Sequence, residues 1–423
     1  MRQTLRRTGL SAVFSMSASA TIALACLGAM QASQAQSAYT LSVLAKPSGA
    51  GSFLPTSLDN QGVVRGGMYQ VNGYTPDTAA TNCFLYCPLY SVREAYWPAA
   101  TSSGTVTGKA GVRDFFGLMG GGSGTQLGAV SSAKTLDYPT WVPHRWLPLP
   151  VTQAGDFHPR PTHVLVPGGT PQALFPEGPA PLSILGANDA GTLVGARGAI
   201  NAQGVPYSIP VVWRQGARTD LPVIQQAPQM SALALDVNES GVIVGATTDW
   251  VPSTSGGFNS AYRPTLWTDG QPTYLGGQEM AELMALAINE SGQVMIGPQI
   301  GTSFQFNPVA YLWSNGAAMQ MRASGKSVHP LAMNDKGVVV GCTRTLEQDP
   351  SITYTRADLT AFIWRDGKLL QLENDMATKG LRLPTGTRLG CPFAINNQGS
   401  ILAFYYKLSA PDTITWVRIN AKP

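Results

Sequence analysis

The feature of this 423-residue chain that most restricts its fold is a motif that recurs about every fifty residues. Each copy is an apolar run, an Asn, two further residues, a Gly and a second apolar run, as in LALDVNESGVIVG at 233–245. In such a turn the Asn side chain bonds the backbone, and the Gly supplies the positive φ that lets a hairpin close. The Asn residues assigned to the copies are Asn60, Asn188, Asn238, Asn289, Asn334 and Asn396.

A second motif alternates with the first at the same spacing. It is an apolar run, a Trp and a turn that ends in Gly, as in TLWTDG at 265–270 and YLWSNG at 311–316. Two motifs that alternate with a period of about 40–50 residues are typical of β-propeller blades. We expect one Asn hairpin and one Trp hairpin to make each four-stranded blade, with the Trp packed between neighbouring blades. The Trp residues of this series are Trp213, Trp267, Trp313, Trp364 and Trp416.

The two ends of the chain predict how the ring of blades closes. The final repeat runs through Trp416 and stops at Pro423 without a fourth strand, whereas YTLSVLAKP at 39–47 resembles a fourth strand that precedes the first Asn hairpin. We therefore expect 39–47 to complete the last blade, which would remove exposed strand edges that favour aggregation.

The region from about 68 to 160 departs from the repeat. Trp97 marks a degenerate unit there, and Val166 takes the place of a Trp in another. Counting both units predicts an all-β fold, a single β-propeller of seven four-stranded blades closed by the N-terminal strand. Six blades with a long insertion remain the alternative.

Alternating Asn hairpins and Trp hairpins of this kind resemble the HAF family of extracellular repeats. The resemblance covers roughly 180–423 well and 39–67 moderately. It implies a secreted, propeller-like protein and brings no established activity or catalytic residue. VVWRQG at 211–216 lacks the Phe before Trp, and QVMIG at 293–297 replaces the usual VVG ending.

The first 35 residues have the order of a secretory signal peptide. Arg2, Arg6 and Arg7 precede an apolar run, and small residues precede a cut after Ala35. The alternative is a lipid anchor at Cys26, which follows a loose lipobox. We expect a secreted or periplasmic monomer, with an outer-membrane lipoprotein as the alternative and no membrane span after cleavage.

Low charge content excludes some classes of partner. Only 12% of the residues are charged, with 28 Lys and Arg against 24 Asp and Glu, and three of the Arg lie in the leader. The exported part is therefore close to neutral and has no strong electrostatic reason to bind nucleic acid.

Four cysteines remain after cleavage, and an even number in an exported protein favours disulfides over metal ligands. We prefer the pairs Cys83–Cys87 and Cys342–Cys391, because the second pair lies at the same end of adjacent predicted blades. Two other pairings of the four remain open.

Several residues could support chemistry, but none forms a catalytic constellation. Asp189, Glu239, Glu290 and Asp335 follow the turn Asn of four repeats and could form a partial ring for a cation; the favoured interpretation is that a polar turn simply tolerates acids there. The four histidines have no metal-binding spacing. Ser131 and Lys134 lack the companion motifs of a serine hydrolase. We predict no catalytic residues, no metal and no cofactor.

Aromatic residues of the irregular region could form a platform that stacks on a sugar ring or a partner. They could equally be the core of degenerate blades, which is the favoured interpretation. These residues are Trp97, Trp141, Trp146, Tyr86 and Tyr90.

The repeat architecture and the signal peptide together predict a non-catalytic exported scaffold that binds a protein or glycan partner through loops on one face. The alternative is a secreted propeller enzyme that acts on polysaccharide, for which two carboxyl groups would have to meet about 5–10 Å apart.

Overall fold

The computed structural model divides the chain into two units, Met1–Ser37 and Ala38–Pro423. The structure describes parts of the second unit only, so the predicted leader and Cys26 lie outside the described residues. No helix among the described residues is long and apolar enough to cross a membrane. The described residues are 38–47, 52–76, 86–99, 101, 103–106, 115–120, 126–130, 163–165, 172–173, 182–200, 202, 204, 206–214, 217–224, 231–252, 258–298, 309–345 and 359–421.

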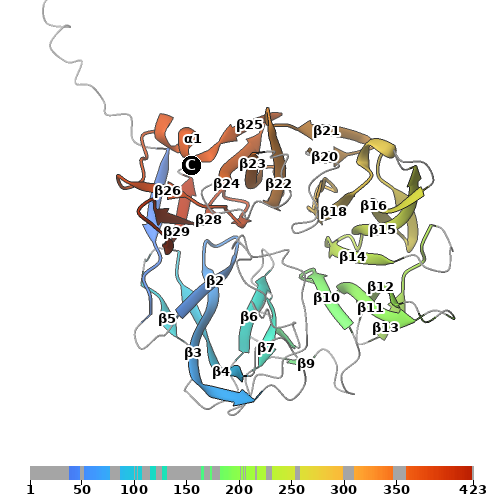
Figure 1. Cartoon of the computed structure of the whole chain (residues 1–423), viewed down its shortest axis with the longest axis horizontal. Coiled ribbons are helices and arrows are strands. Elements are labelled where there is room, and N and C mark those ends of the chain that lie inside the picture. Colours follow the sequence, from blue (N-terminus) through green and yellow to red (C-terminus); the bar gives the residue numbers. More distant parts are fainter. Residues whose placement is uncertain are drawn as a thin grey trace, which may run out of the picture. The chain divides into compact units, whose positions relative to one another are not determined.

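These residues form antiparallel sheets whose strands follow one another in chain order, and within the second unit the sheets succeed each other around a common centre (Figure 1). The first three four-stranded sheets are β2 (Ser52–Leu58), β3 (Val64–Pro76), β4 (Tyr86–Trp97) and β5 (Thr105–Val106); β6 (Phe115–Gly120), β7 (Gln126–Val130), β8 (His163–Leu165) and β9 (Gln172–Ala173); and β10 (Leu182–Ala187), β11 (Leu193–Ile200), β12 (Pro206–Arg214) and β13 (Ala217–Asp220).

Three more four-stranded sheets follow. They are β14 (Ala232–Val237), β15 (Ile243–Pro252), β16 (Phe258–Thr268) and β17 (Gln271–Tyr274); β18 (Leu283–Ile288), β19 (Val294–Pro298), β20 (Ala310–Ser314) and β21 (Ala317–Met321); and β22 (Lys326–Met333), β23 (Val339–Thr345), β24 (Leu359–Arg365) and β25 (Lys368–Gln371). A 3-10 helix, η1 (Gln278–Met280), precedes β18, and the helix α1 (Leu372–Thr378) follows β25. The protein is therefore all-β in class.

The last sheet combines the two ends of the second unit. It contains β26 (Thr387–Leu389), β27 (Ala394–Ile395), β28 (Ile401–Lys407), β29 (Ala410–Ala421) and β1 (Tyr39–Val43). The pairing of β1 with β29 is antiparallel, with Tyr39 opposite Ala421 and Val43 opposite Val417. The prediction that the N-terminal strand joins the final repeat is confirmed.

A polar cluster fixes the start of β1 against α1. The Tyr39 hydroxyl donates to Asp375 at 2.8 Å, and Asp375 also receives Arg365 at 2.6 Å and Lys379 at 3.0 Å. The backbone N–H of Ala38 donates to the carbonyl of Lys379. Because Asp375 is buried and its charge is matched by two cations, this cluster holds the N-terminal strand in place.

Trp267 and Trp364 pack between sheets as predicted, Trp313 keeps the same register opposite Val294 but is only partly buried, and Trp416 requires a correction. Trp213, Trp267 and Trp364 are each opposite the first residue after an Asn turn, and all are buried. Trp97 occupies the same register opposite Val64 and is fully buried, so it is a regular member. Trp416 is not a regular member of the series. In the last sheet Ile401 is the first residue after the Asn turn, and Ile419 stands opposite it. Trp416 packs instead against the rings of Phe393 and Phe404.

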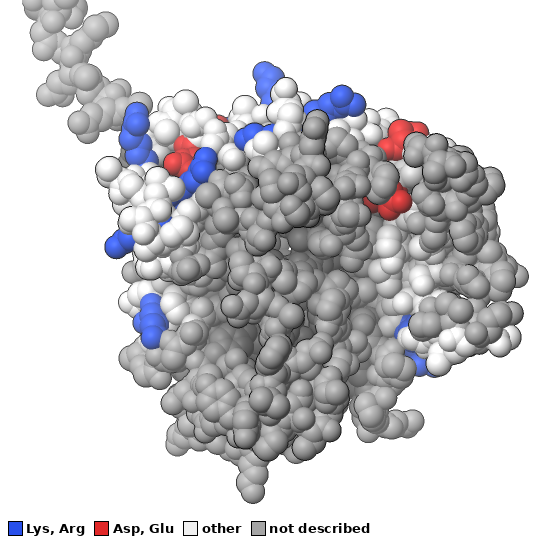
Figure 2. Space-filling view, viewed as in Figure 1, with Lys and Arg blue, Asp and Glu red and all other residues white. Residues whose placement is uncertain are grey.

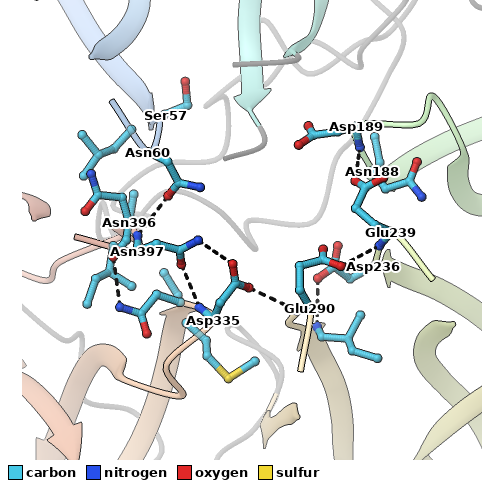
Figure 3. A pocket seen from close by; sticks show the side chains of 18 of the residues that line it. Ser57, Asn60, Asn188, Asp189, Asp236, Glu239, Glu290, Asp335, Asn396 and Asn397 are labelled. Atoms are coloured by element: carbon cyan, nitrogen blue, oxygen red, sulfur yellow. Dashed lines mark hydrogen bonds between the residues drawn. The ribbon is translucent and has the colours of Figure 1, made fainter. Parts of the chain in front are cut away.

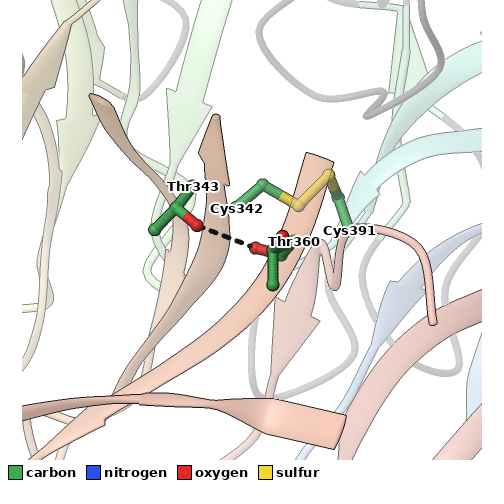
Figure 4. Close-up of a disulfide and its surroundings, with 4 residues drawn as sticks. All are labelled: Cys342, Thr343, Thr360 and Cys391. Atoms are coloured by element: carbon green, nitrogen blue, oxygen red, sulfur yellow. Dashed lines mark hydrogen bonds between the residues drawn. A yellow bond between two sulfur atoms is a disulfide. The ribbon is translucent and has the colours of Figure 1, made fainter. Parts of the chain in front are cut away.

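A disulfide joins two neighbouring sheets. Cys342 lies in β23 and Cys391 lies between β26 and β27, with their Cα atoms 5.4 Å apart (Figure 4). Both residues are buried beside Leu331. This predicted pair is confirmed. Cys83 lies outside the described residues, and the side chain of Cys87 in β4 is not described.

The side chain of Arg418 connects the last sheet to the first through hydrogen bonds. Its side chain is 1% exposed, and its Nη1 donates to the carbonyls of Gly62 at 2.6 Å and Pro98 at 3.1 Å. Its Nη2 donates to the carbonyls of Ala99 and Thr101. Burial lowers the pKa of this guanidinium. The planar fork of donors therefore binds four carbonyls in two loops of the first sheet at once, and the Gly62 contact is buried.

Replacing Arg418 with Met is expected to lower the free energy of unfolding by about 3 kcal/mol, because the buried carbonyl of Gly62 and three further carbonyls with partly buried bonds lose their charged donor. Arg418→Lys should lose less, since an ammonium retains the charge and some of the bonds. Urea unfolding of both variants measures the two losses. A Met variant as stable as the parent would contradict this role.

Candidate functional site: the turns around the central pocket

Each regular repeat turns at an Asn that uses both ends of its carboxamide. In the first of these turns the Asn188 Oδ1 accepts from the N–H of Thr192 at 2.8 Å, and the N–H of Gly191 donates to the Asn188 carbonyl. Gly191 has a φ of 80°, as the turn requires. The other four Asn turns repeat the Oδ1 bond to the residue four places on. The predicted role of Asn and Gly in the turn is confirmed.

The other end of the carboxamide links each turn to the next sheet. Asn188 Nδ2 donates to the carbonyl of Asn238 at 2.9 Å, and Asn238 Nδ2 donates to the carbonyl of Asn289 at 3.3 Å. The series continues from Asn289 to Asn334, from Asn334 to Asn396, and from Asn396 to Asp59. We call this series the asparagine ladder. It explains why the repeat needs a side chain that both accepts and donates.

The ladder corrects the assignment of the first repeat. Asp59, and not Asn60, occupies the turn position, because Asp59 Oδ1 accepts from the N–H of Val63 at 2.8 Å and the N–H of Gly62 donates to the Asp59 carbonyl. Asn60 occupies the following position. The spacing agrees with the hydrogen bonds, because two residues separate Asp59 from Gly62 whereas only Gln61 separates Asn60 from it.

A second series of bonds connects the residues that follow the ladder. The N–H of Glu239 donates to Glu290 at 3.0 Å, that of Glu290 to Asp335 at 3.1 Å, and that of Asp335 to Asn397 Oδ1 at 2.9 Å. At one end of the series the backbone N–H of Asp189 donates to the carboxylate of Glu239. At the other end the backbone N–H of Asn397 donates to Asn60 Oδ1. Acids and amides at five of these positions thus share one role, because each accepts a backbone N–H from the neighbouring turn.

The turns enclose a pocket of about 390 Å³ (Figure 3). The described side chains that line it come from six sheets and include no Lys or Arg. On the face shown in Figure 2, the described Lys and Arg side chains lie toward the outer rim of the sheets. The ionisable residues of the pocket are Asp189, Asp236, Glu239, Glu290 and Asp335, and its carboxamides are Asn60, Asn188, Asn334, Asn396 and Asn397.

The carboxylates repel one another across the pocket. Burial raises the pKa of Glu290, the N–H of Glu239 that it accepts opposes this rise, and the charges of Glu239, Asp335 and Asp189 add to it. Because the folded pKa lies above the unfolded one, this carboxyl stabilises the fold most below its ordinary pKa and loses that contribution as the pH rises. The pocket thus gathers several carboxyl groups, and no Lys or Arg is among the described residues that line it.

The structure brings the four predicted carboxylates together in the lining of one pocket. Trp97, in contrast, cannot contribute to the predicted aromatic platform. That residue is fully buried, its Nε1 donates to the carbonyl of Ala45 at 2.9 Å, and its ring packs on Phe53. It therefore belongs to the core, as the favoured interpretation held. Tyr86 and Tyr90 lie in β4 with side chains that are not described, and Trp141 and Trp146 lie outside the described residues.

Other candidates are also placed. Ser131, Lys134, Val166, His144 and His158 lie outside the described residues, and His163 lies in β8. His329 is buried in β22 with its Nε2 2.8 Å from Ser327 Oγ. Among the described residues, no group of three or more His, Cys, Asp or Glu could hold a metal ion.

Asp236 was missed from the sequence. Its Oδ2 accepts from the N–H of Ile288 at 2.9 Å, which links β14 to β18 next to the ladder. The register of β14 with β15 shifts between Ala234 and Asp236, so a bulge changes the face on which Asp236 lies. The one available signal was an acid within the apolar run LALDV.

Breaking one step of the ladder is expected to destabilise the fold. Asn238→Asp keeps the acceptor that closes its own turn but removes the donor to the Asn289 carbonyl, so the free energy of unfolding should fall by about 1–2 kcal/mol. Asn238→Ala removes both bonds and should lose more. Thermal or urea unfolding measures both losses. An Asn238→Asp variant as stable as the parent would show that the donor to the next sheet contributes nothing.

No family model matches this chain, and no curated protein matches it. Solved structures similar to it include the β-propeller domain of the trilobed protease from Pyrococcus furiosus, described as having an open velcro topology, at 8% identity and a TM-score of 0.44, covering 86% of this chain and 95% of that one. The acylaminoacyl peptidase of Pyrococcus horikoshii matches at 9% identity and a TM-score of 0.43, covering 84% of this chain and 50% of that one. The polysaccharide lyase Uly1 matches at 8% identity and a TM-score of 0.33, covering 89% and 91%. At these values no activity is carried over to this chain.

Proposed function

We propose that this protein is an exported seven-bladed β-propeller that acts as a non-catalytic scaffold and binds a partner at its central pocket. The sheets would be the blades, with β1 completing the last of them. Export is supported by the order of residues in 1–35 and by the disulfide, which oxidising compartments favour. The HAF-like repeats fit the same proposal.

The observation that carries the binding role is the chemistry of the pocket lining. Its volume of about 390 Å³ falls in the range of small-ligand sites, roughly 300–1,000 Å³. The carboxamide N–H groups of the ladder asparagines donate to neighbouring turns, whereas a carboxylate such as Glu290 has more acceptor sites than the backbone N–H it accepts. Such a lining offers acceptors and negative charge, which suits an ammonium or guanidinium group of a protein partner.

Rigidity of the lining supports the same role. The ladder and the second series of bonds fix each pocket side chain to the turn of the next sheet, so a partner would meet groups that are already in position. A neutral glycan is less favoured, because the described aromatic side chains of the lining are limited to Phe393. The enzyme alternative would assign an acid role to Glu290, whose raised pKa is the property that such a role needs.

Titration calorimetry of the purified protein with a tetra-arginine peptide, a tetraglutamate peptide and neutral oligosaccharides tests this proposal. We expect only tetra-arginine to bind, more weakly as salt rises. A Glu239→Gln, Glu290→Gln variant should bind it about tenfold more weakly. Asp366→Asn, an exposed carboxylate outside the pocket, is the matched control.

Two outcomes would contradict the proposal. Binding of a neutral oligosaccharide without tetra-arginine would remove the cationic partner, and oligosaccharide cleavage that is lost in Glu290→Gln would favour the enzyme. Mass spectrometry of the exported N-terminus separately distinguishes a cut after Ala35 from a lipid anchor at Cys26.

A further inference from the structure

The turn between β20 and β21 carries the dipeptide Asn315-Gly316 on the surface. Both residues have left-handed backbones, with φ values of 49° and 84°. Asn315 is exposed, and among the described residues no hydrogen bond of its carboxamide is found. An Asn followed by Gly is chemically labile, because the unbranched Gly lets its backbone nitrogen reach the Asn side chain.

The equivalent turns of two other sheets carry an acid in place of this Asn. Asp269-Gly270 has φ values of 51° and 75°, and Asp366-Gly367 has values of 51° and 72°. Each joins a third strand to a fourth, as Asn315-Gly316 does. The fold therefore already accepts a carboxylate at this turn position with an unchanged backbone.

The ladder asparagines differ from Asn315 in every property that matters for this chemistry. Asn238, for example, is 3% exposed, and its Oδ1 and Nδ2 are both hydrogen-bonded. It is followed by Glu239 rather than Gly. Its carboxamide carbon is consequently shielded from attack, whereas that of Asn315 is not.

We propose that Asn315 is a site of spontaneous deamidation, independent of the function proposed above. The backbone nitrogen of Gly316 attacks Cγ of Asn315, the side-chain amide leaves as ammonia, and a cyclic succinimide forms. Water then opens the ring at either carbonyl and yields aspartate or isoaspartate. No oxidant or enzyme is required, and each event adds one negative charge to the protein.

The tight turn slows the first step without preventing it. Attack requires the backbone of Asn315 to leave its left-handed conformation, so the hairpin must open locally. The first three residues of β21, Ala317 to Met319, are exposed, so this opening disrupts little packing. Deamidation should therefore be slower in the folded protein than in a peptide of the same sequence.

The two products should differ in their effect on the fold. Aspartate reproduces the turns at Asp269 and Asp366 and should be tolerated. Isoaspartate places an extra carbon in the main chain of a two-residue loop, which is incompatible with the pairing of Ser314 and Ala317. Its formation should disconnect β21 from β20.

Peptide mapping of the folded protein, aged at mildly alkaline pH and physiological temperature, tests the proposal. We expect the peptide with Asn315 to gain about 1 Da and to contain isoaspartate, on the order of tenfold faster than the peptide with Asn238. Gly316→Ala should slow the gain at Asn315, and Asn315→Asp should leave the melting temperature unchanged. Asn72-Gly73 in β3 is mapped in a separate peptide.

Equal rates at Asn315 and Asn238 would overturn the proposal, as would a rate unaffected by Gly316→Ala in the urea-unfolded protein, where the strain of Ala at a φ of 84° has no effect. If Asn315 deamidates but Asn315→Asp has a lowered melting temperature, the inference from the turns at Asp269 and Asp366 that aspartate is tolerated is wrong. Neither result depends on whether the central pocket binds a cationic partner.

Discussion

Replacement of Cys342 and Cys391 by Ala together is expected to lower the free energy of unfolding by about 4 kcal/mol. The bridge closes a loop with a sequence separation of 49 residues, and loop-closure entropy for a loop of that size gives a value near this one. Urea unfolding under non-reducing conditions, with the double variant beside the parent, measures the loss. The effect is large because the bridge connects the last two sheets, and the last of them also holds β1.

Reduction provides the matched control. A reductant should destabilise the double variant by about 4 kcal/mol less than the parent, since that variant has no bridge between these sheets to lose. If the variant and the parent unfold at the same urea concentration, the bridge contributes nothing to stability and this expectation is wrong. A single Cys342→Ala variant would not be a clean comparison, because it leaves Cys391 as a buried free thiol.

Acid is expected to destabilise the protein through His329. Burial and the nearby charge of Arg344 lower the pKa of His329 from 6.5 to about 4. The unfolded chain therefore binds a proton more readily than the folded one, so stability is fully present above pH 6.5 and falls as the pH approaches 4. Over that interval the loss due to this residue is about 3 kcal/mol.

The measurement is the free energy of unfolding at several pH values in the parent and in His329→Gln. Gln cannot titrate, so the variant should lose about 3 kcal/mol less between pH 6.5 and 4, whatever its stability at neutral pH. Parallel curves for the two proteins would contradict the assignment. Glu290 acts in the opposite direction, because its raised pKa favours the fold as the pH falls, but it does so equally in both proteins.

Much of the fold follows from local chemistry and could be predicted from the sequence. A turn that needs an Asn acceptor and a Gly of positive φ selects the same residues wherever it occurs, so its recurrence reveals the sheets one by one. The pairing of β1 with β29 was predictable because the last repeat lacks a strand and the N-terminus supplies one. The Cys342–Cys391 pair followed from the positions of both residues relative to their turns.

The register of paired strands and the exact turn residue were less predictable than the repeating unit. Trp416 keeps the spacing of the Trp series, yet Ile419 occupies its place opposite Ile401, and Trp416 stands opposite Phe404. Asn60 was assigned to the first turn although Asp59 makes the turn bonds. A displacement of one or three residues barely alters a sequence pattern, whereas it changes every hydrogen bond and every buried face of a strand.

The sequence by itself determined the repeating unit, the all-β class and the way the two ends of the chain meet, since each rests on residues within one unit or at one end. Only the tertiary structure decided what the residues after each turn do. The bonds from Glu239 to Glu290 and onward join side chains from different sheets, and the pocket exists only where six sheets meet. Contacts between units depend on how the units are rotated against one another, and no spacing along the chain encodes that angle.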